Sequence, residues 1–135
     1  MVDALSALLA AAKFDAGGLI PAIAQQHDSG EVLTLAYVNR ESLAATLRSG
    51  QVTYWSRERK KLWRKGEISG QTQNLVELRL DCDGDAILLL VDQKGAACHT
   101  GQRSCFFRAL RDGDLVTIAE PLVSPEKLYP GGASH

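Results

Sequence analysis

The chain has 135 residues, of which 45% are hydrophobic and 23% charged, and its formal net charge is -1. That length fits one domain, and the near-neutral charge gives no general electrostatic reason to bind nucleic acid or an anionic membrane surface. No apolar run approaches the roughly 18 to 20 residues that span a bilayer, so we expect no membrane partner.

The N-terminal region predicts one helix and two strands. Leucines at helical spacing predict a short helix over residues 3–13. Ile20–Gln26 and Val32–Val38 have the composition of strands, and residues 27–30 form the turn between them. The region has no basic segment before its apolar residues and is therefore a poor signal peptide.

The next segment predicts a second helix and a third strand. Asn39 is a good N-cap for a helix over Arg40–Leu47, and Gly50 ends it. Val52–Ser56 predicts a strand, and we expect a basic loop after it.

The second half of the chain predicts further strands. Leu75–Leu80 alternates, which places Val76, Leu78 and Leu80 on one face, and Ala86–Val91 is a continuous apolar run typical of a buried strand. We expect a turn at residues 92–95, a strand over Phe106–Leu110 and a loosely ordered tail from about residue 121. The pattern predicts an α+β fold, a β-rich single domain with short helices.

Basic and aromatic residues are interleaved over Tyr54–Gly66. This pattern suits a ligand with both phosphates and a planar base. The Gly- and hydroxyl-rich stretch at residues 67–74 adds donors for phosphate oxygens. A solvated basic loop anchored by two tryptophans is an alternative, and a nucleic-acid patch is another, although a single basic loop on a neutral domain is weak support for it.

All three cysteines lie near a cluster of aspartates. The two segments are Asp81-Cys82-Asp83-Gly84-Asp85 and Cys98-His99-Thr100-Gly101-Gln102-Arg103-Ser104-Cys105. Thiolates select zinc, whereas a carboxylate cluster suits a hard ion such as magnesium. Three thiolates leave one position of a zinc tetrahedron open, which a catalytic zinc needs to hold and acidify a water. The pattern predicts a metal-dependent hydrolytic enzyme.

Other interpretations of these segments remain open. If strand geometry continued past Leu80, the three aspartates would share one face and Cys82 would point to the other. Asp81–Asp85 alone is also typical of a polar hairpin turn, and Ala86 excludes a calcium loop that needs glycine there. Free cysteines are often inert core residues. His99 is a candidate for proton transfer, with an exposed loop histidine as the alternative.

Several motifs together resemble the phosphoribosyl-AMP cyclohydrolase family of histidine biosynthesis. They are Trp55-Ser56-Arg57, Leu62-Trp63, Lys65-Gly66-Glu67, Ser69-Gly70, Asp81 to Asp85, Cys98-His99-Thr100-Gly101 and Ser104-Cys105-Phe106. The resemblance runs from about Leu33 to Phe107. Small departures stand at Thr34, Ile68 and Gln71, none of them a metal ligand.

The resemblance implies an intertwined homodimer with its sites between the subunits. Cys82 of one chain would join Cys98 and Cys105 of the other around zinc, and Asp81, Asp83 and Asp85 would bind magnesium. The implied reaction is hydrolytic opening of the purine ring of phosphoribosyl-AMP at the N1–C6 bond by a zinc-activated water. The product is a formimino aminoimidazole carboxamide ribonucleotide.

By the same resemblance, His99 would move a proton, and the substrate would contact Trp55, Ser56, Arg57, Lys65 and Ser69. We expect a cytoplasmic, stand-alone enzyme without a fused pyrophosphohydrolase domain and without a nucleic-acid partner. Two rivals remain: a non-catalytic zinc module that holds a nucleotide or RNA, and a redox protein that uses Cys98 and Cys105 as a dithiol, although they lack the C-x-x-C spacing.

Overall fold

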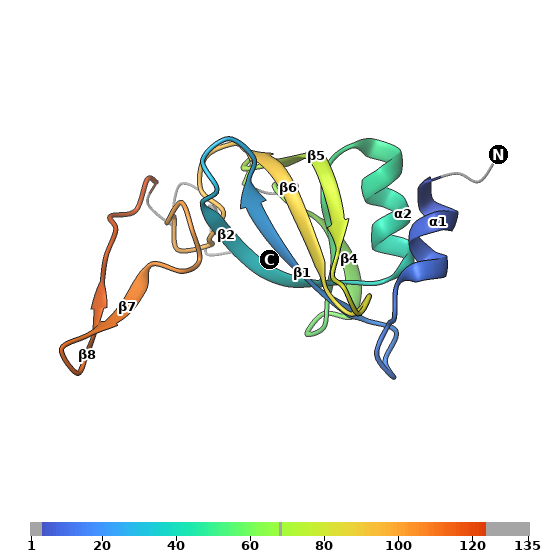
Figure 1. The fold of residues 1–135 in the computed structure, drawn as a ribbon. Helices are drawn as coiled ribbons and strands as arrows, with labels where there is room; N and C mark the ends of the chain where they lie inside the picture. The colour runs from blue at the N-terminus through green and yellow to red at the C-terminus, as the bar shows by residue number, and fades with distance from the viewer. Residues whose placement is uncertain (1–3, 68, 124–135) are drawn as a thin grey trace.

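The computed structural model describes residues 4–67 and 69–123, and its main feature is a curved six-stranded sheet with two helices packed together on one side (Figure 1). The elements are α1 (Ala4–Ala11), β1 (Ile20–Gln26), β2 (Val32–Val38), α2 (Arg40–Ser49), β3 (Thr53–Ser56), β4 (Lys61–Arg64), β5 (Gln73–Leu80), β6 (Ile87–Gln93), β7 (Arg108–Arg111) and β8 (Asp114–Thr117). No helix among the described residues has the length and apolar character needed to cross a membrane. The α+β, β-rich prediction is confirmed.

The sheet has the order β4-β3-β2-β1-β6-β5. β1 pairs in parallel with β6, whereas the other neighbouring strands are antiparallel. Alternate residues of the neighbouring strands β1 and β6 are buried, including Ile20 and Ala24 on β1 and Leu89 and Val91 on β6. These side chains form the core with Leu43 of α2, which is fully buried.

Backbone hydrogen bonds around Val52 bring the two edges of the sheet together. The Val52 amide donates to the Gln73 carbonyl at 2.9 Å, and the Lys65 amide donates to the Val52 carbonyl at 2.9 Å. The Leu75 amide donates to the Gly50 carbonyl at 2.8 Å. The sheet therefore curls back on itself, and β5 approaches the end of β4.

The predicted capping of the second helix is confirmed. The Asn39 side chain accepts a hydrogen bond from the Ser42 amide at 2.8 Å, and the Ser42 hydroxyl accepts from the Asn39 amide at 2.8 Å. This reciprocal pair satisfies two donors at the helix start. Gly50 ends the helix with φ of 77°, a conformation that favours glycine. The helix runs two residues beyond the predicted Leu47.

Two expectations about individual strands are wrong. The predicted basic loop after β3 contains strand β4, because Leu62 and Trp63 pair with Trp55 and Tyr54 in a hairpin despite the surrounding charges. The Tyr54 and Trp63 ring centroids lie 5.0 Å apart. Val76 does not share a face with Leu78 and Leu80, because the register between β5 and β6 shifts there, and Val76 is 55% exposed.

The region after β6 also departs from the prediction. Asp92 and Gln93 extend β6 instead of forming a turn, and the strand expected from Phe106 begins at Arg108. That strand, β7, forms with the unpredicted β8 a hairpin that projects from the body of the molecule (Figure 1). Most of the tail expected to be loosely ordered, residues 124–135, lies outside the described residues.

Candidate active site

Two of the three cysteines lie together on the loop that follows β6. Cys98 is buried and Cys105 is half-buried. A hydrogen bond from the Cys105 side chain lowers the pKa of Cys98 to about 5, and the same bond raises the pKa of Cys105. The Thr100 hydroxyl donates to Cys98 Sγ at 3.1 Å, and Cys105 Sγ lies 3.2 Å from Thr34 Oγ1. We refer to Cys98 and Cys105 as the thiol pair; its chemistry fits a soft divalent ion.

Buried and half-buried polar side chains hold the loop that carries the thiol pair. The Gln71 side-chain carbonyl accepts from the Ala96 amide at 2.9 Å, and Gln93 Nε2 donates to the Gln71 carbonyl at 3.1 Å. Arg103 Nη1 donates to the carbonyls of Gln93 and Gly95 at 3.0 and 2.8 Å. The loop is therefore fixed before any ion binds.

Gly95 lies in this loop and packs closely against the Gln71 side chain. Its φ is 72°, and a Cβ atom there would overlap Oε1 of Gln71. In a Gly95→Ala variant the Gln71 side chain must move away, which leaves the buried Ala96 amide without its acceptor. Such a loss costs about 1 to 3 kcal/mol beyond the cost of a left-handed alanine.

Gly113 supplies the matched control, because its φ is 85° and no atom lies near the position of its Cβ. We expect Gly95→Ala to lower the free energy of urea unfolding by about 1 to 3 kcal/mol more than Gly113→Ala does. Equal losses in the two variants would contradict the packing of Gln71 against Gly95.

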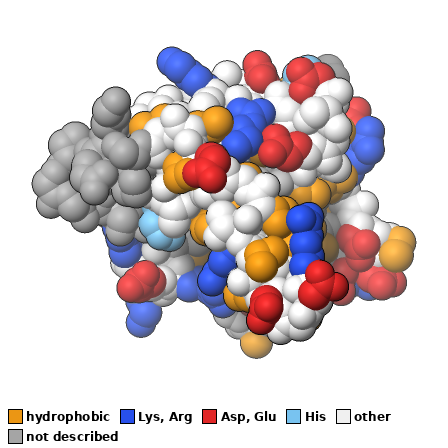
Figure 2. Space-filling view, turned by 90° about the vertical axis from the view of Figure 1, so that its left-hand side faces the viewer, with side chains coloured by type: hydrophobic (Ala, Val, Ile, Leu, Met, Phe, Trp, Pro, Cys, Tyr) orange, Lys and Arg blue, Asp and Glu red, His pale blue; other side chains and the backbone are white. Residues whose placement is uncertain are grey.

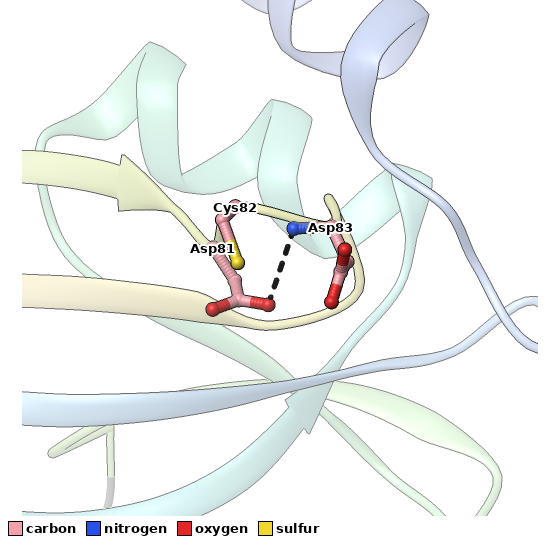
Figure 3. Close-up of side chains that lie close together, drawn as sticks. All are labelled: Asp81, Cys82 and Asp83. Carbon is pink, nitrogen blue, oxygen red and sulfur yellow. Dashed lines mark hydrogen bonds between the residues drawn. The ribbon is translucent and has the colours of Figure 1, made fainter.

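The aspartate cluster forms the turn between β5 and β6. The Asp81 amide donates to the Ala86 carbonyl at 2.8 Å, and the Gly84 amide donates to the Asp81 carbonyl at 2.9 Å. The polar hairpin turn is therefore present, and the expectation that strand geometry would separate Cys82 from the aspartates is wrong. Ligand atoms of Asp81, Cys82 and Asp83 lie within 4.8 Å of one another, on the same side of the turn (Figure 3).

The carboxyl groups of this turn interact with each other. A hydrogen bond between Asp81 and Asp85 lowers the pKa of Asp81 and raises that of Asp85. The Asp83 amide also donates to an Asp81 carboxylate oxygen at 3.4 Å. Carboxylates this close repel one another when both are ionised, so a bound cation would stabilise them.

The structure does not bring Cys82 to the thiol pair within one chain. Cys82 precedes β6 and Cys98 follows it, so the seven-residue strand lies between them (Figure 1). A strand of that length spans roughly 20 Å, whereas a zinc–sulfur bond is about 2.3 Å long. A single ion cannot bind all three cysteines of one chain in this conformation.

A groove runs from the hairpin of β3 and β4, which we call the basic hairpin, to the thiol pair. Its outer part has a volume of about 570 Å³ and is lined by residues of β2, β3 and β4: Leu35, Ala36, Tyr37, Trp55, Ser56, Arg57, Glu58 and Trp63. Its inner part, of about 180 Å³, is lined by Thr34, Leu35, Ala36, Trp63, Lys65, Ala97, His99 and Cys105. The two parts share Leu35, Ala36 and Trp63 and therefore lie next to each other.

The predicted substrate residues occupy different parts of this site. Trp55, Ser56 and Arg57 line the outer groove, with the Arg57 guanidinium 3.9 Å from the centroid of the Tyr37 ring. Lys65 and His99 line the inner pocket. Ser69 lines neither part; its hydroxyl accepts a hydrogen bond from the Gln71 amide at 3.2 Å.

Sequence reasoning did not select Tyr37 and Thr34 as site residues. Tyr37 lines the groove because it pairs with Trp55 between β2 and β3. Thr34 lies at the site because the loop that carries the thiol pair places Cys105 against β2. The Cys105 amide donates to the Leu33 carbonyl at 2.6 Å, which fixes that return. The aromatic residue in the alternating Val32–Val38 strand was a signal for Tyr37, but the strand register was needed to use it.

Side chains of both charges lie on the surface at the end of the molecule that carries the β7–β8 hairpin. Figure 2 shows basic, acidic and hydrophobic side chains interspersed on the face viewed from the side of the β7–β8 hairpin. On this face the basic side chains do not merge into one continuous patch. A local groove therefore describes the surface better than a broad cationic footprint.

Comparison with known proteins assigns the chain to a family. The phosphoribosyl-AMP cyclohydrolase family model matches residues 34–107. A protein of Rhodospirillum centenum named phosphoribosyl-AMP cyclohydrolase is 66% identical over 128 residues, covering 95% of this chain and 96% of its own. Proteins of the same name from Rhodospirillum rubrum and Alkalilimnicola ehrlichii are 61% and 64% identical, covering 96% and 93% of this chain and 92% and 88% of their own. The chain belongs to the phosphoribosyl-AMP cyclohydrolase family.

Proposed function

We propose that this chain hydrolyses phosphoribosyl-AMP in histidine biosynthesis, in the cytoplasm. Water opens the purine ring at the N1–C6 bond and gives the formimino aminoimidazole carboxamide ribonucleotide. The names of the relatives support this reaction. The observation that carries it here is the pair of adjoining pockets, one lined by aromatic and basic residues of the β3–β4 hairpin and the other by Cys105 and His99.

The thiol pair and the aspartate turn supply the donors for two metal ions. We assign Cys98 and Cys105 to zinc, which when bound would acidify a water for attack on the purine. The strand between Cys98 and Cys82 supports a homodimer in which the partner subunit provides the third thiolate. Asp81, Asp83 and Asp85 would bind magnesium, because carboxylates so close together favour a hard cation.

The groove side chains have separate roles in this proposal. Trp55 and Tyr37 offer aromatic faces to the purine, and Arg57 and Ser56 offer donors to a phosphate. His99 lines the inner pocket beside Cys105, in a position to exchange a proton with the reacting purine. Ser69, which is half-buried, and Lys65 stay predicted phosphate contacts of the same substrate.

Turnover of phosphoribosyl-AMP by the purified protein, followed by ultraviolet absorbance, tests this function. We expect turnover that a zinc chelator abolishes and added zinc restores, because the attacking water depends on the ion. Metal analysis before and after chelation is the control, since a tightly held ion can resist the chelator. Folded, zinc-loaded protein that shows no turnover with magnesium present would overturn the proposal and favour a non-catalytic nucleotide-binding module.

A further inference from the structure

Lys65 is a charged side chain in the interior of the molecule. It follows β4 and is 2% exposed, and its backbone amide is fixed by the hydrogen bond to Val52. Its ammonium donates to the Ala97 carbonyl at 2.6 Å. Within residues 4–67 and 69–123, Lys65 forms no ion pair with a carboxylate. A buried ammonium without a counter-charge is costly, so a negative group close to it would stabilise it.

The thiol pair is the candidate for that negative group. Ala97, which accepts from Lys65, directly precedes Cys98, and Lys65 and Cys105 line the same inner pocket. Burial lowers the pKa of Lys65, while Cys105 and Cys98 act in the opposite direction and raise it. The ammonium and the thiols are therefore close enough to affect each other's charge.

We propose that Lys65 is a positioning residue for the thiol pair: its ammonium holds the Ala97–Cys98 backbone in place and balances the charge of the thiolates when they bind metal. The inference rests on the proposed zinc site. Three thiolates around a divalent cation leave one net negative charge, and one buried ammonium cancels it. This role is additional to the proposed contact with substrate phosphate, because it uses the hydrogen bond of the ammonium to the protein's own backbone.

Two substitutions separate charge from hydrogen bonding. Lys65→Met removes both the charge and the donor, whereas Lys65→Gln keeps an N–H donor without the charge. Lys61→Gln is the matched control, because Lys61 lies in the same basic hairpin and is exposed. The readout is zinc affinity, measured by competition with a chromophoric chelator, together with thermal unfolding of the zinc-free proteins.

We expect Lys65→Met and Lys65→Gln to bind zinc about tenfold to a hundredfold more weakly than the wild type, as other losses of groups around metal ligands do. Zinc-free Lys65→Met should unfold at a temperature close to that of the zinc-free wild type, because removal of a buried charge offsets the lost hydrogen bond to the Ala97 carbonyl. Lys61→Gln should match the wild type in both measurements. A residue needed only for folding would instead destabilise the zinc-free protein when replaced.

The other outcomes are decisive as well. Wild-type zinc affinity in both Lys65 variants would overturn the inference, and weak binding by Lys65→Met alone would overturn the role of charge. Zinc-free Lys65→Met that is largely unfolded would also count against it, because Lys65 would then be needed for folding. If the wild-type chain failed to bind zinc, the proposed function and this inference would both fall, whereas normal wild-type binding with unchanged variants would overturn this inference alone.

Discussion

A mixed dimer of Cys82→Ala and Cys98→Ala subunits should recover activity that neither variant has alone. Cys82 lies at the end of β6 opposite the thiol pair, so the proposed three-thiolate site would need residues of two chains. In the mixed dimer one of the two sites loses both cysteines and the other keeps all three. Each variant alone should lose about a thousandfold or more in turnover, because the proposed zinc would contribute several kcal/mol to stabilising the transition state.

Subunits with two different affinity tags allow the mixed dimer to be purified through both tags. Its turnover per dimer should be about half that of the wild type, since one of two symmetric sites is intact. The control combines Cys98→Ala with Cys105→Ala, which leaves no intact site in either arrangement. Recovery in the control, or none in the Cys82–Cys98 pair, would show that the site is not shared in this way.

His99→Asn should lower turnover by about a hundredfold to ten-thousandfold, the range for loss of a general acid or base. His99 lines the inner pocket with Cys105 and Lys65, and asparagine keeps a polar side chain of similar size there. Zinc content should stay at the wild-type level, because the proposed ligand set does not include His99. The measurements are turnover at saturating substrate and bound zinc in the same preparation.

His27→Asn is the matched control for this substitution. His27 lies in the exposed turn between β1 and β2, outside both parts of the groove. Turnover by the His27→Asn variant should therefore equal that of the wild type. A His99→Asn protein that loses its zinc would point instead to a fourth metal ligand. Wild-type turnover with full zinc would remove His99 from the proton transfer.

Local patterns were enough to predict much of this fold. The bounds of β1 and β2 match the prediction, and Asn39 and Gly50 mark the ends of α2 through their own hydrogen bonds and backbone angles. Strand β4 was missed because the charges around Leu62 and Trp63 hide the pairing with β3. The bulge at Val76 was missed because it depends on the register of the neighbouring strand.

In the candidate site, too, the sequence predicts features formed by residues close together in the chain, but not those formed by residues far apart. The thiol pair follows from residue type and spacing, because both cysteines lie on one loop. The groove does not follow from residue type and spacing, because it forms only where β2 lies beside β3. The pairing of Tyr37 with Trp55 defines that strand contact. Extending strand geometry through Asp81–Asp85 failed because the chain reverses there, a change of direction that the Asp-Gly turn signal indicates.

The parallel pairing of β1 with β6 has a consequence for how the chain reaches its folded state. Ala22 pairs with Ile87, and about half of the 135-residue chain lies between them. During synthesis β1 and β2 can form a hairpin early, but β6, the other neighbour of β1 in the sheet, is synthesised much later. Contacts so distant in sequence form slowly, because a large loop must close before they contribute stability. Until that closure, one edge of β1 stays open to pairing with other chains, so this stage is where aggregation is most expected.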